Sequence, residues 1–456
     1  MLIKDEYVRA YSGLPRRAWI LFAVNLVNSS GAMVLFFLSL YLTRELGFSA
    51  ARAGQILSLY GAGSLAGAYL GGWMADRAGS IRVQKGSLAA CGVLLIALGG
   101  VVSAWGIGAL LFAYALAAGM LYPANATSMS KICPPEVQVK GFALNRLANN
   151  LGATIGPAVG GMLAVRDYRL LFWADGLTSI AAAAVFVLLW RGAREEREGS
   201  VERKGRAAGV AREDRTDGEE SAERQERSNE AERANEAERT ALAEPVVGDR
   251  APAPANASRS PWRDGPFLVL MLIFLVWSAV FIQVLTTFPL YMRNVYGLAE
   301  NRIGQLFAVN TILIVVLEMI LMERIRKYPL ARMINVSFLL LGLGLGLMPL
   351  GRGFAFGALT VAIWTFGEML SMPLVTALIA GRADDTNRGR YMGVFSLVFS
   401  LAFVVAPAGG TAIYGRFGGD AVWYVSAALC LLIAAAFSAL RPYLSGVGPQ
   451  QNQLNQ

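Results

Sequence analysis

The sequence contains no histidine and only three cysteines among its 456 residues. Zinc sites are built from cysteine and histidine, and a disulfide framework needs closely patterned cysteines, so we expect neither a bound metal nor disulfides. Charged residues are also scarce, at 16%, whereas 55% of the residues are apolar. An average soluble domain has roughly 25% charged residues. The composition therefore indicates a chain whose main solvent is lipid.

The sequence also lacks a Gly-Lys dipeptide, and this excludes the phosphate-binding loop of P-loop ATPases. The net charge is +9, but the basic residues lie in short loops between apolar runs. That distribution is typical of membrane orientation and not of a nucleic-acid surface. We expect no cofactor and no nucleic-acid partner.

Twelve apolar stretches are long enough to cross a bilayer, because a helix needs about 20 residues to span about 30 Å of hydrocarbon. They predict an all-α membrane protein. The predicted spans are residues 18–42, 53–75, 86–105, 107–129, 141–165, 170–190, 267–291, 303–322, 330–350, 354–380, 391–413 and 421–440.

The basic residues of alternate short loops predict the orientation in the membrane. Leaving the long central loop aside, about 17 fall on one side and about 8 on the other, and the richer side is normally cytoplasmic. Both termini are then predicted to be cytoplasmic, in a multi-pass protein of the plasma membrane. The cytoplasmic group includes Arg77, Arg82, Lys85, Arg324, Arg326, Lys327, Arg382, Arg388 and Arg390.

The central segment, residues 191–265, is a different polymer that is rich in Glu and Arg and has almost no large apolar residues. Such a segment cannot form a core, so we predict a disordered cytoplasmic linker, with a partner-docking or regulatory segment as the alternative. The domains are then a six-helix bundle at 1–190, the linker at 191–265, a second bundle at 266–441 and a cytoplasmic tail at 442–456.

The two predicted bundles are related by an internal repeat. LYLTRELGFSAARAGQ, at 40–55, resembles LYMRNVYGLAENRIGQ, at 290–305, with an offset of 250. A constant offset over several helices indicates two copies of one six-helix unit, and a parallel repeat of this kind is typical of transporters that rock two halves around a central site. Two bundles fused for stability alone are the alternative. The same offset relates Pro123 to Pro373, Pro157 to Pro407 and Gly160 to Gly410.

Two motifs carry chemistry. The loop GGWMADRAGSIR has charged residues, Asp76, Arg77 and Arg82, between glycines that allow a tight turn. It can form a latch that holds the two halves together in one state. Alternatively, its basic residues only set the orientation of the protein in the membrane. GATIGPAVGG offers a flat glycine face for helix contact, with Pro157 bending the helix.

On these motifs the chain resembles the major facilitator superfamily. Its loop signature is matched by Gly72, Asp76, Arg77 and Gly79, and its helix 5 antiporter motif by Gly152, Gly156, Pro157, Gly160 and Gly161. The second match resembles drug/proton antiporters more than sugar symporters. Two departures stand out: Ser80 and Ile81 replace two basic residues that usually follow the loop signature, and helix 4 lacks the arginine of many drug antiporters.

Ionisable residues within the apolar runs are costly in hydrocarbon and are therefore candidates for function. Glu368, midway along predicted helix 10, is the first candidate for a proton carrier. Arg146 can pair with an acid, bind an anionic group of the substrate or snorkel to the surface. Asp175 is either a second proton site or a polar cap, and Glu318 either contributes to proton coupling or forms a salt bridge near Glu323 at the membrane interface.

The resemblance implies that helices 1, 4, 7 and 10 line a central cavity. Candidate cavity residues on them are Asn25, Asn28, Gln283 and Trp364, and helix packing is the alternative explanation for each.

We therefore expect a monomeric secondary active transporter, embedded in the bilayer, that uses protons to export small amphipathic or hydrophobic substrates by alternating access. A carrier of one metabolite, such as a sugar, amino acid or organic anion, is the first alternative, and Arg146 would then bind an anionic group. A membrane-embedded enzyme or receptor is the second, and the absence of histidine argues against most versions of it.

Overall fold

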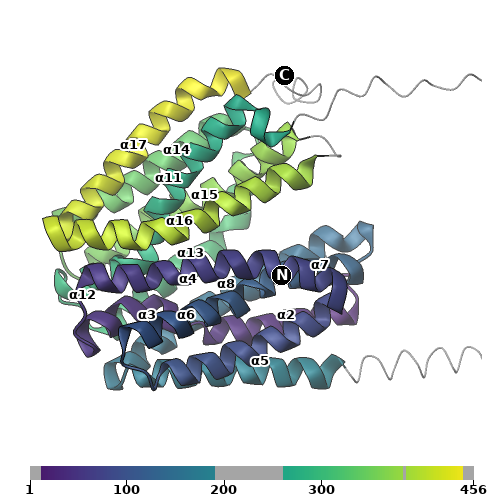
Figure 1. Ribbon diagram of the computed structural model, residues 1–456. Helices are drawn as coiled ribbons and strands as arrows, with labels where there is room; N and C mark the ends of the chain where they lie inside the picture. Colours follow the sequence, from purple (N-terminus) through teal and green to yellow (C-terminus); the bar gives the residue numbers. More distant parts are fainter. Residues whose placement is uncertain (1–11, 191–259, 384–386, 445–456) are drawn as a thin grey trace, which may run out of the picture. The chain divides into compact units, whose positions relative to one another are not determined.

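The computed structural model describes residues 12–190, 260–383 and 387–444, and within these ranges the chain is helical with no strand (Figure 1). The linker predicted at 191–265 falls outside the described residues up to position 259, and so does the tail from position 445. The prediction of an all-α membrane protein is confirmed.

The first half contains eight α-helices and two short π-helical turns within the described residues. They are α2 (Arg16–Gly31), α3 (Val34–Leu40), η1 (Tyr41–Glu45), α4 (Ala50–Met74), η2 (Ala75–Gly79), α5 (Ser80–Leu98), α6 (Ala104–Gly119), α7 (Leu121–Ile132), α8 (Pro135–Arg166) and the helix Arg169–Trp190.

The second half follows the same plan. It comprises η3 (Pro261–Arg263), α11 (Gly265–Thr286), α12 (Phe288–Asn294), α13 (Glu300–Ile325), α14 (Leu330–Leu347), η4 (Met348–Leu350), α15 (Phe354–Arg382), α16 (Arg388–Phe417) and α17 (Gly419–Leu444).

Four predicted spans differ clearly from the observed helices. The span 86–105 is the helix Ser80–Leu98, because Gly79 turns the chain with φ +92° and Ser103 caps the next helix. The spans 18–42, 107–129 and 267–291 are each broken: the first between α2 and α3, the second between α6 and α7 at Met120, and the third between α11 and α12 at Thr287. Local hydropathy does not reveal such breaks, because both sides of each remain apolar.

Ten helical stretches of the described residues are long and apolar enough to cross a membrane. One of them, Ala50–Leu98, joins α4 and α5 and at 49 residues is long enough for two crossings. The 32-residue helix α8 is not among the ten. The count of twelve spans stays a prediction.

The internal repeat is visible in the backbone. Gly47 and Gly297, 250 residues apart, have φ values of +70° and +69°. In each copy the residue after this glycine donates its N–H to a carbonyl six residues earlier, from Phe48 to Leu42 at 2.9 Å and from Leu298 to Met292 at 3.0 Å. The two halves therefore share local geometry as well as sequence.

The halves pack mainly through two helix pairs, α4 along α16 and α8 along α13 (Figure 1). Main chains approach closely at glycines: a Cβ on Gly54 would lie 2.6 Å from the carbonyl oxygen of Pro407, and one on Gly304 would lie 2.3 Å from that of Pro157. These contacts are equivalent under the 250-residue repeat. The interface therefore has approximate two-fold symmetry.

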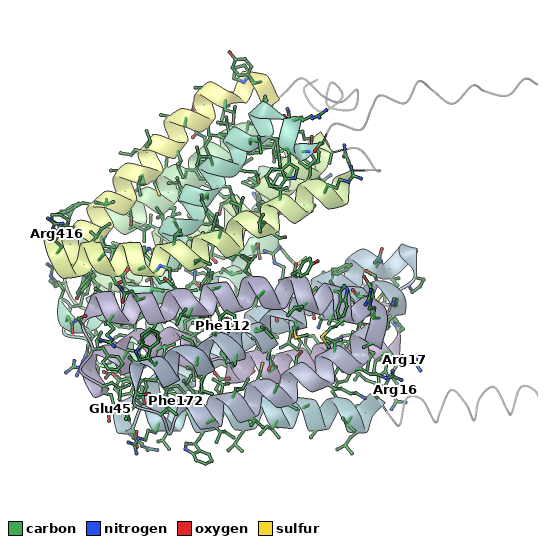
Figure 2. The ribbon with its side chains drawn as sticks, viewed as in Figure 1. Arg16, Arg17, Glu45, Phe112, Phe172 and Arg416 are labelled. Carbon is green, nitrogen blue, oxygen red and sulfur yellow. The ribbon has the colours of Figure 1, made fainter. Side chains whose placement is uncertain are left out.

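The two ends of the helices carry different residues. Arg16 and Arg17 lie at one end, and Glu45 and Arg416 lie at the opposite end (Figure 2). The first we call the Asp76 end, because α4 ends there. The second we call the Glu300 end, because α13 begins there.

Candidate functional site

A cluster of polar side chains joins the two halves where α8 packs along α13. Arg146 of α8 forms an ion pair with Glu318 of α13, with side chains 53% and 11% exposed respectively. Arg146 lies roughly 30 Å along α8 from Arg166, at about 1.5 Å per residue, so this pair is nearer the Asp76 end. The structure thus pairs two of the predicted residues with each other across the interface.

Glu368 belongs to the same cluster. Its Oε2 accepts a hydrogen bond from the Asn310 amide at 2.8 Å, and that amide also donates to the Thr365 hydroxyl at 3.0 Å. Glu368 lies within electrostatic range of both Glu318 and Arg146. Two carboxylates and one guanidinium, contributed by both halves, therefore influence one another.

Asp175 has a different setting. Its carboxylate, on a side chain only 3% exposed, accepts the backbone N–H groups of Met33 at 3.1 Å and Val34 at 3.2 Å. These are donors at the start of α3 that have no partner within the helix. Of the two predicted roles for Asp175, this geometry is that of a cap, and it accounts for the break in the first span.

The glycines of the predicted antiporter motif pack α8 against that break. A Cβ on Gly152 would lie 2.3 Å from Ser29, one on Gly156 would lie 2.8 Å from the Ala32 carbonyl oxygen, and one on Gly160 would lie 2.9 Å from Met33. Only small residues permit this approach. On the other side of the helix, Gly161 and Pro157 face the start of α13, so the motif contacts both halves.

The predicted cavity amides are bonded to neighbouring helices. Asn25 donates to Asn145 at 2.9 Å and Asn149 at 2.8 Å on α8, whereas Asn28 accepts from Ser179 at 3.4 Å. The two amides therefore contact different helices.

The other two cavity candidates are buried within the second half. Gln283 donates to the Ala406 carbonyl at 2.8 Å and accepts from Thr286 and Thr287. Trp364 is 1% exposed and packs against Gly344 of α14. Both side chains are engaged in helix packing in this conformation.

The segment Gly72–Arg82, which we call the gating loop, exposes its charged residues at the Asp76 end. The Arg77 guanidinium lies over the Trp73 ring, 4.4 Å from its centroid, and Asp76 forms no ion pair or hydrogen bond with a described residue. Arg82 is also exposed. A Cβ on Gly72 would meet nothing within 4 Å, so the face of α4 that carries Gly72 is open at this level.

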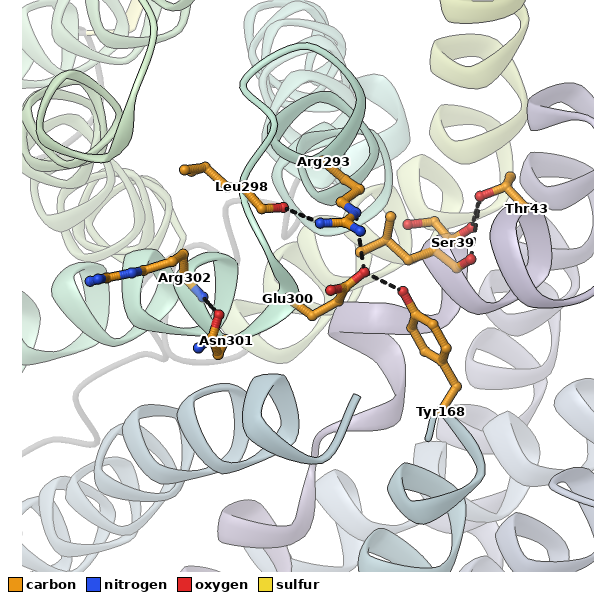
Figure 3. Close-up of polar contacts among 9 residues, drawn as sticks. Ser39, Thr43, Tyr168, Arg293, Leu298, Glu300, Asn301 and Arg302 are labelled. Atoms are coloured by element: carbon orange, nitrogen blue, oxygen red, sulfur yellow. Dashed lines mark hydrogen bonds and ion pairs between the residues drawn. The ribbon is translucent and has the colours of Figure 1, made fainter. Parts of the chain in front are cut away.

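The Glu300 end has a cross-half contact that sequence reasoning missed. The Tyr168 hydroxyl donates to Glu300 Oε1 at 2.7 Å, and Arg293 Nε lies 3.4 Å from the same oxygen (Figure 3). Burial and the bond to Glu300 raise the pKa of Tyr168 well above its usual range, so it remains a donor. One signal was available: Glu300 corresponds to Ala50 in the first copy of the repeat.

Metal-binding chemistry finds no support in the part of the chain that the structure describes, where no three His, Cys, Asp or Glu side chains come together.

The Major Facilitator Superfamily model matches residues 20–386 and 366–455. The chain belongs to the major facilitator superfamily. The resemblance drawn from the gating loop and the α8 glycines is therefore confirmed, and so is the fold class. A member of this family is a multi-pass membrane transporter of small molecules, so the family indicates transport and not the catalysis of a reaction.

Relatives in this superfamily differ in what they carry. The chain is 24% identical to a Na(+), Li(+), K(+)/H(+) antiporter of Planococcus maritimus over 84% of this chain and 85% of that one. It is 23% identical to the multidrug resistance protein MdtH of Edwardsiella ictaluri, over 86% and 84%. A crystal structure of the peptide transporter POT in complex with sulfate superposes with a TM-score of 0.70 at 18% identity, covering 95% and 96%. The last likeness shows the fold alone.

Proposed function

We propose that this superfamily member is a proton-coupled exporter of small amphipathic or hydrophobic compounds that works by alternating access. The observation that carries the proposal is the cluster of Glu368, Glu318 and Arg146, where ionisable groups of both halves meet inside the helices. The names of two relatives, a cation/proton antiporter and a multidrug resistance protein, support proton exchange and drug export.

In the proposed mechanism Glu368 carries the proton. When Glu368 is ionised, it competes with Glu318 for the single guanidinium of Arg146. When it is protonated, Arg146 pairs with Glu318 alone, and the contact between α8 and α13 is at its firmest. Loading and release of the proton thus change the strength of a bond between the halves, and this biases their relative orientation.

The gating loop acts at the Asp76 end, which the positive-inside rule assigns to the cytoplasm. In the present conformation its charges are exposed, and the halves are held together at the Glu300 end by Tyr168 and Glu300. We propose that Asp76 and Arg77 engage the second half when the Asp76 end closes. Alkylation of cysteines at positions 77 and 324 from the same side of the membrane checks this orientation, and labelling from opposite sides contradicts it.

Proton-driven efflux of ethidium from cells, or its uptake into inverted vesicles, tests the role of Glu368. Glu368→Gln keeps the size of the side chain and the bond to Asn310 but cannot exchange a proton, so we expect the dependence on the proton gradient to disappear. Glu323→Gln is the matched control, because Glu323 is exposed and its ion pair is with Arg326 at the end of its own helix. Unchanged coupling in Glu368→Gln would remove this residue from the mechanism.

A carrier for one metabolite is the second candidate, favoured by the half-exposed guanidinium of Arg146, which retains donors for an anionic group. A substrate panel with and without a protonophore separates the two. Loss of one acidic substrate alone in Arg146→Gln would favour the metabolite carrier, whereas reduced efflux of chemically unrelated dyes would favour the exporter.

A further inference from the structure

Ser80 is buried although it directly follows the exposed turn of the gating loop. Gly79 adopts φ +92°, and Asp76 and Arg77 before it are exposed. Ser80 begins α5 and is 5% exposed. A hydroxyl that is buried beside an exposed turn needs a hydrogen-bond partner.

Ser80 finds this partner in a ladder of buried hydrogen bonds to α7. Ser80 and Gln84 lie one turn apart on α5 and face Ala124 and Ser128, one turn apart on α7. Ser128 Oγ donates to Ser80 Oγ at 2.8 Å. Gln84 Nε2 donates to Ser128 Oγ at 2.7 Å and to the Ala124 carbonyl oxygen at 3.2 Å. All three polar side chains are buried, where a lost partner is costly because water cannot replace it.

Apolar packing surrounds this ladder. Ala75 and Val83, on either side of the turn, form a buried cluster with Met120 and Ala124. A Cβ on Gly71 would lie 2.5 Å from the Cα of Met120, so the end of α4 is in main-chain contact with the break between α6 and α7. The gating loop is thus attached to the segment that follows this break.

We propose that Ser80, Gln84 and Ser128 are positioning residues that make the gating loop and α7 move as one body about the break at Met120. The proposal rests on the gating role proposed for Asp76 and Arg77. None of the three side chains titrates near neutral pH, so the joint keeps its geometry while the proton-carrying cluster changes charge.

Two isosteric substitutions isolate the hydroxyl of Ser128. The threonine of Ser128→Thr and the valine of Ser128→Val have the same shape as each other. Only threonine can still form hydrogen bonds with Ser80 and Gln84. We expect the maximal rate of ethidium transport to fall about tenfold in the valine variant, with KM unchanged, and to stay within about twofold of the parent in the threonine variant. Ser130→Ala, exposed on the same helix, is the control and should leave the rate unchanged.

A second measurement does not depend on the substrate. The three native cysteines are buried, so Ala78→Cys offers an exposed thiol in the gating loop for a spin label. The label should be more mobile with valine at position 128 than with threonine. Equal mobility and equal rates in the two variants would overturn the proposal, and so would a loss of rate that follows only the amount of folded protein. If the parent does not transport ethidium, the proposed function is in doubt, while the label comparison still decides the role of the ladder.

Discussion

A Cβ on Gly304 would lie 2.3 Å from the carbonyl oxygen of Pro157, so the main chains of α13 and α8 touch across the two halves. The repeat provides an equivalent contact between Gly54 of α4 and Pro407 of α16, at 2.6 Å. A side chain at either glycine cannot be accommodated by a rotamer change, because the neighbouring atom belongs to a backbone.

Gly304→Ala is expected to wedge the halves apart at the Glu300 end. Overpacking of a tight contact costs about 1–3 kcal/mol, and here the strain falls on the conformation in which this contact is made. Transport should fall about fivefold or more. Gly86→Ala, where a Cβ would meet nothing within 4 Å, serves as the control in the same transport assay. Full activity of the Gly304 variant would mean that the helices separate here without cost.

Tyr168→Phe should make the Glu300 end open more readily. The ring remains, but Glu300 loses the hydroxyl donor from the opposite half and keeps its ion pair with Arg293 of its own half. A hydrogen bond to a carboxylate contributes about 1.5 kcal/mol, so its loss should shift the equilibrium between closed and open conformations roughly tenfold toward the open one. A cysteine at Phe36, which packs on Phe307 across the interface, should be alkylated correspondingly faster.

Tyr296→Phe is the matched control for that experiment. The Tyr296 hydroxyl donates to the Met348 carbonyl within the second half, so its loss removes a hydrogen bond without affecting the contact between halves. Equal alkylation rates in both variants would show that Tyr168 does not hold the Glu300 end closed.

Asp264 predicts a pH-dependent stability. Burial tends to raise its pKa, but the bonds from Arg382, at 2.7 Å to each oxygen, from the Phe267 N–H and from Tyr391 outweigh this and lower the pKa below the ordinary 3.8. A carboxylate whose pKa is lowered by folding stabilises the folded protein at every pH above its pKa in the unfolded chain. This stabilisation is lost as the pH falls through its pKa in the folded protein.

Asp264→Asn should therefore destabilise the protein by about 3 kcal/mol near neutral pH, because the buried Arg382 guanidinium loses the counter-charge of Asp264. The difference from the parent should shrink below pH 3.8. Thermal denaturation in detergent between pH 7 and about pH 3 measures it. If the stability difference between Asp264→Asn and the parent stayed constant over this pH range, the lowered pKa of Asp264 would be contradicted.

Asp175→Asn should preserve both folding and proton coupling. The asparagine carbonyl oxygen can still accept the N–H groups of Met33 and Val34, whereas Asp175→Ala removes the cap at a cost of about 1–2 kcal/mol. Comparing proton-driven transport and thermal stability of the two variants distinguishes a cap from a proton site. Loss of proton coupling in the asparagine variant would show that Asp175 is a proton site and not merely a cap.

The fold could be predicted to the level of helices and family, and the site could be predicted only as single residues. Arg146 and Glu318 were both candidates, but nothing local to either one indicated that they pair with each other. The amides Asn25 and Gln283 were candidates for the cavity or for helix packing, and the tertiary structure shows them bonded to neighbouring helices. Tyr168 and Glu300 were missed because each lies at a helix end, where polar residues are ordinary.

By itself, the sequence determined the membrane setting, the approximate positions of the helices, the repeat and the superfamily. Apolar length, a constant offset of 250 and a motif are properties of short stretches of chain. Only the tertiary structure decided where helices break and which charges meet. A break depends on a cap from a distant helix, as with Asp175, and an ion pair such as that of Arg146 and Glu318 depends on the register in which α8 and α13 pack. That register is set by contacts between halves of the chain that are far apart in sequence.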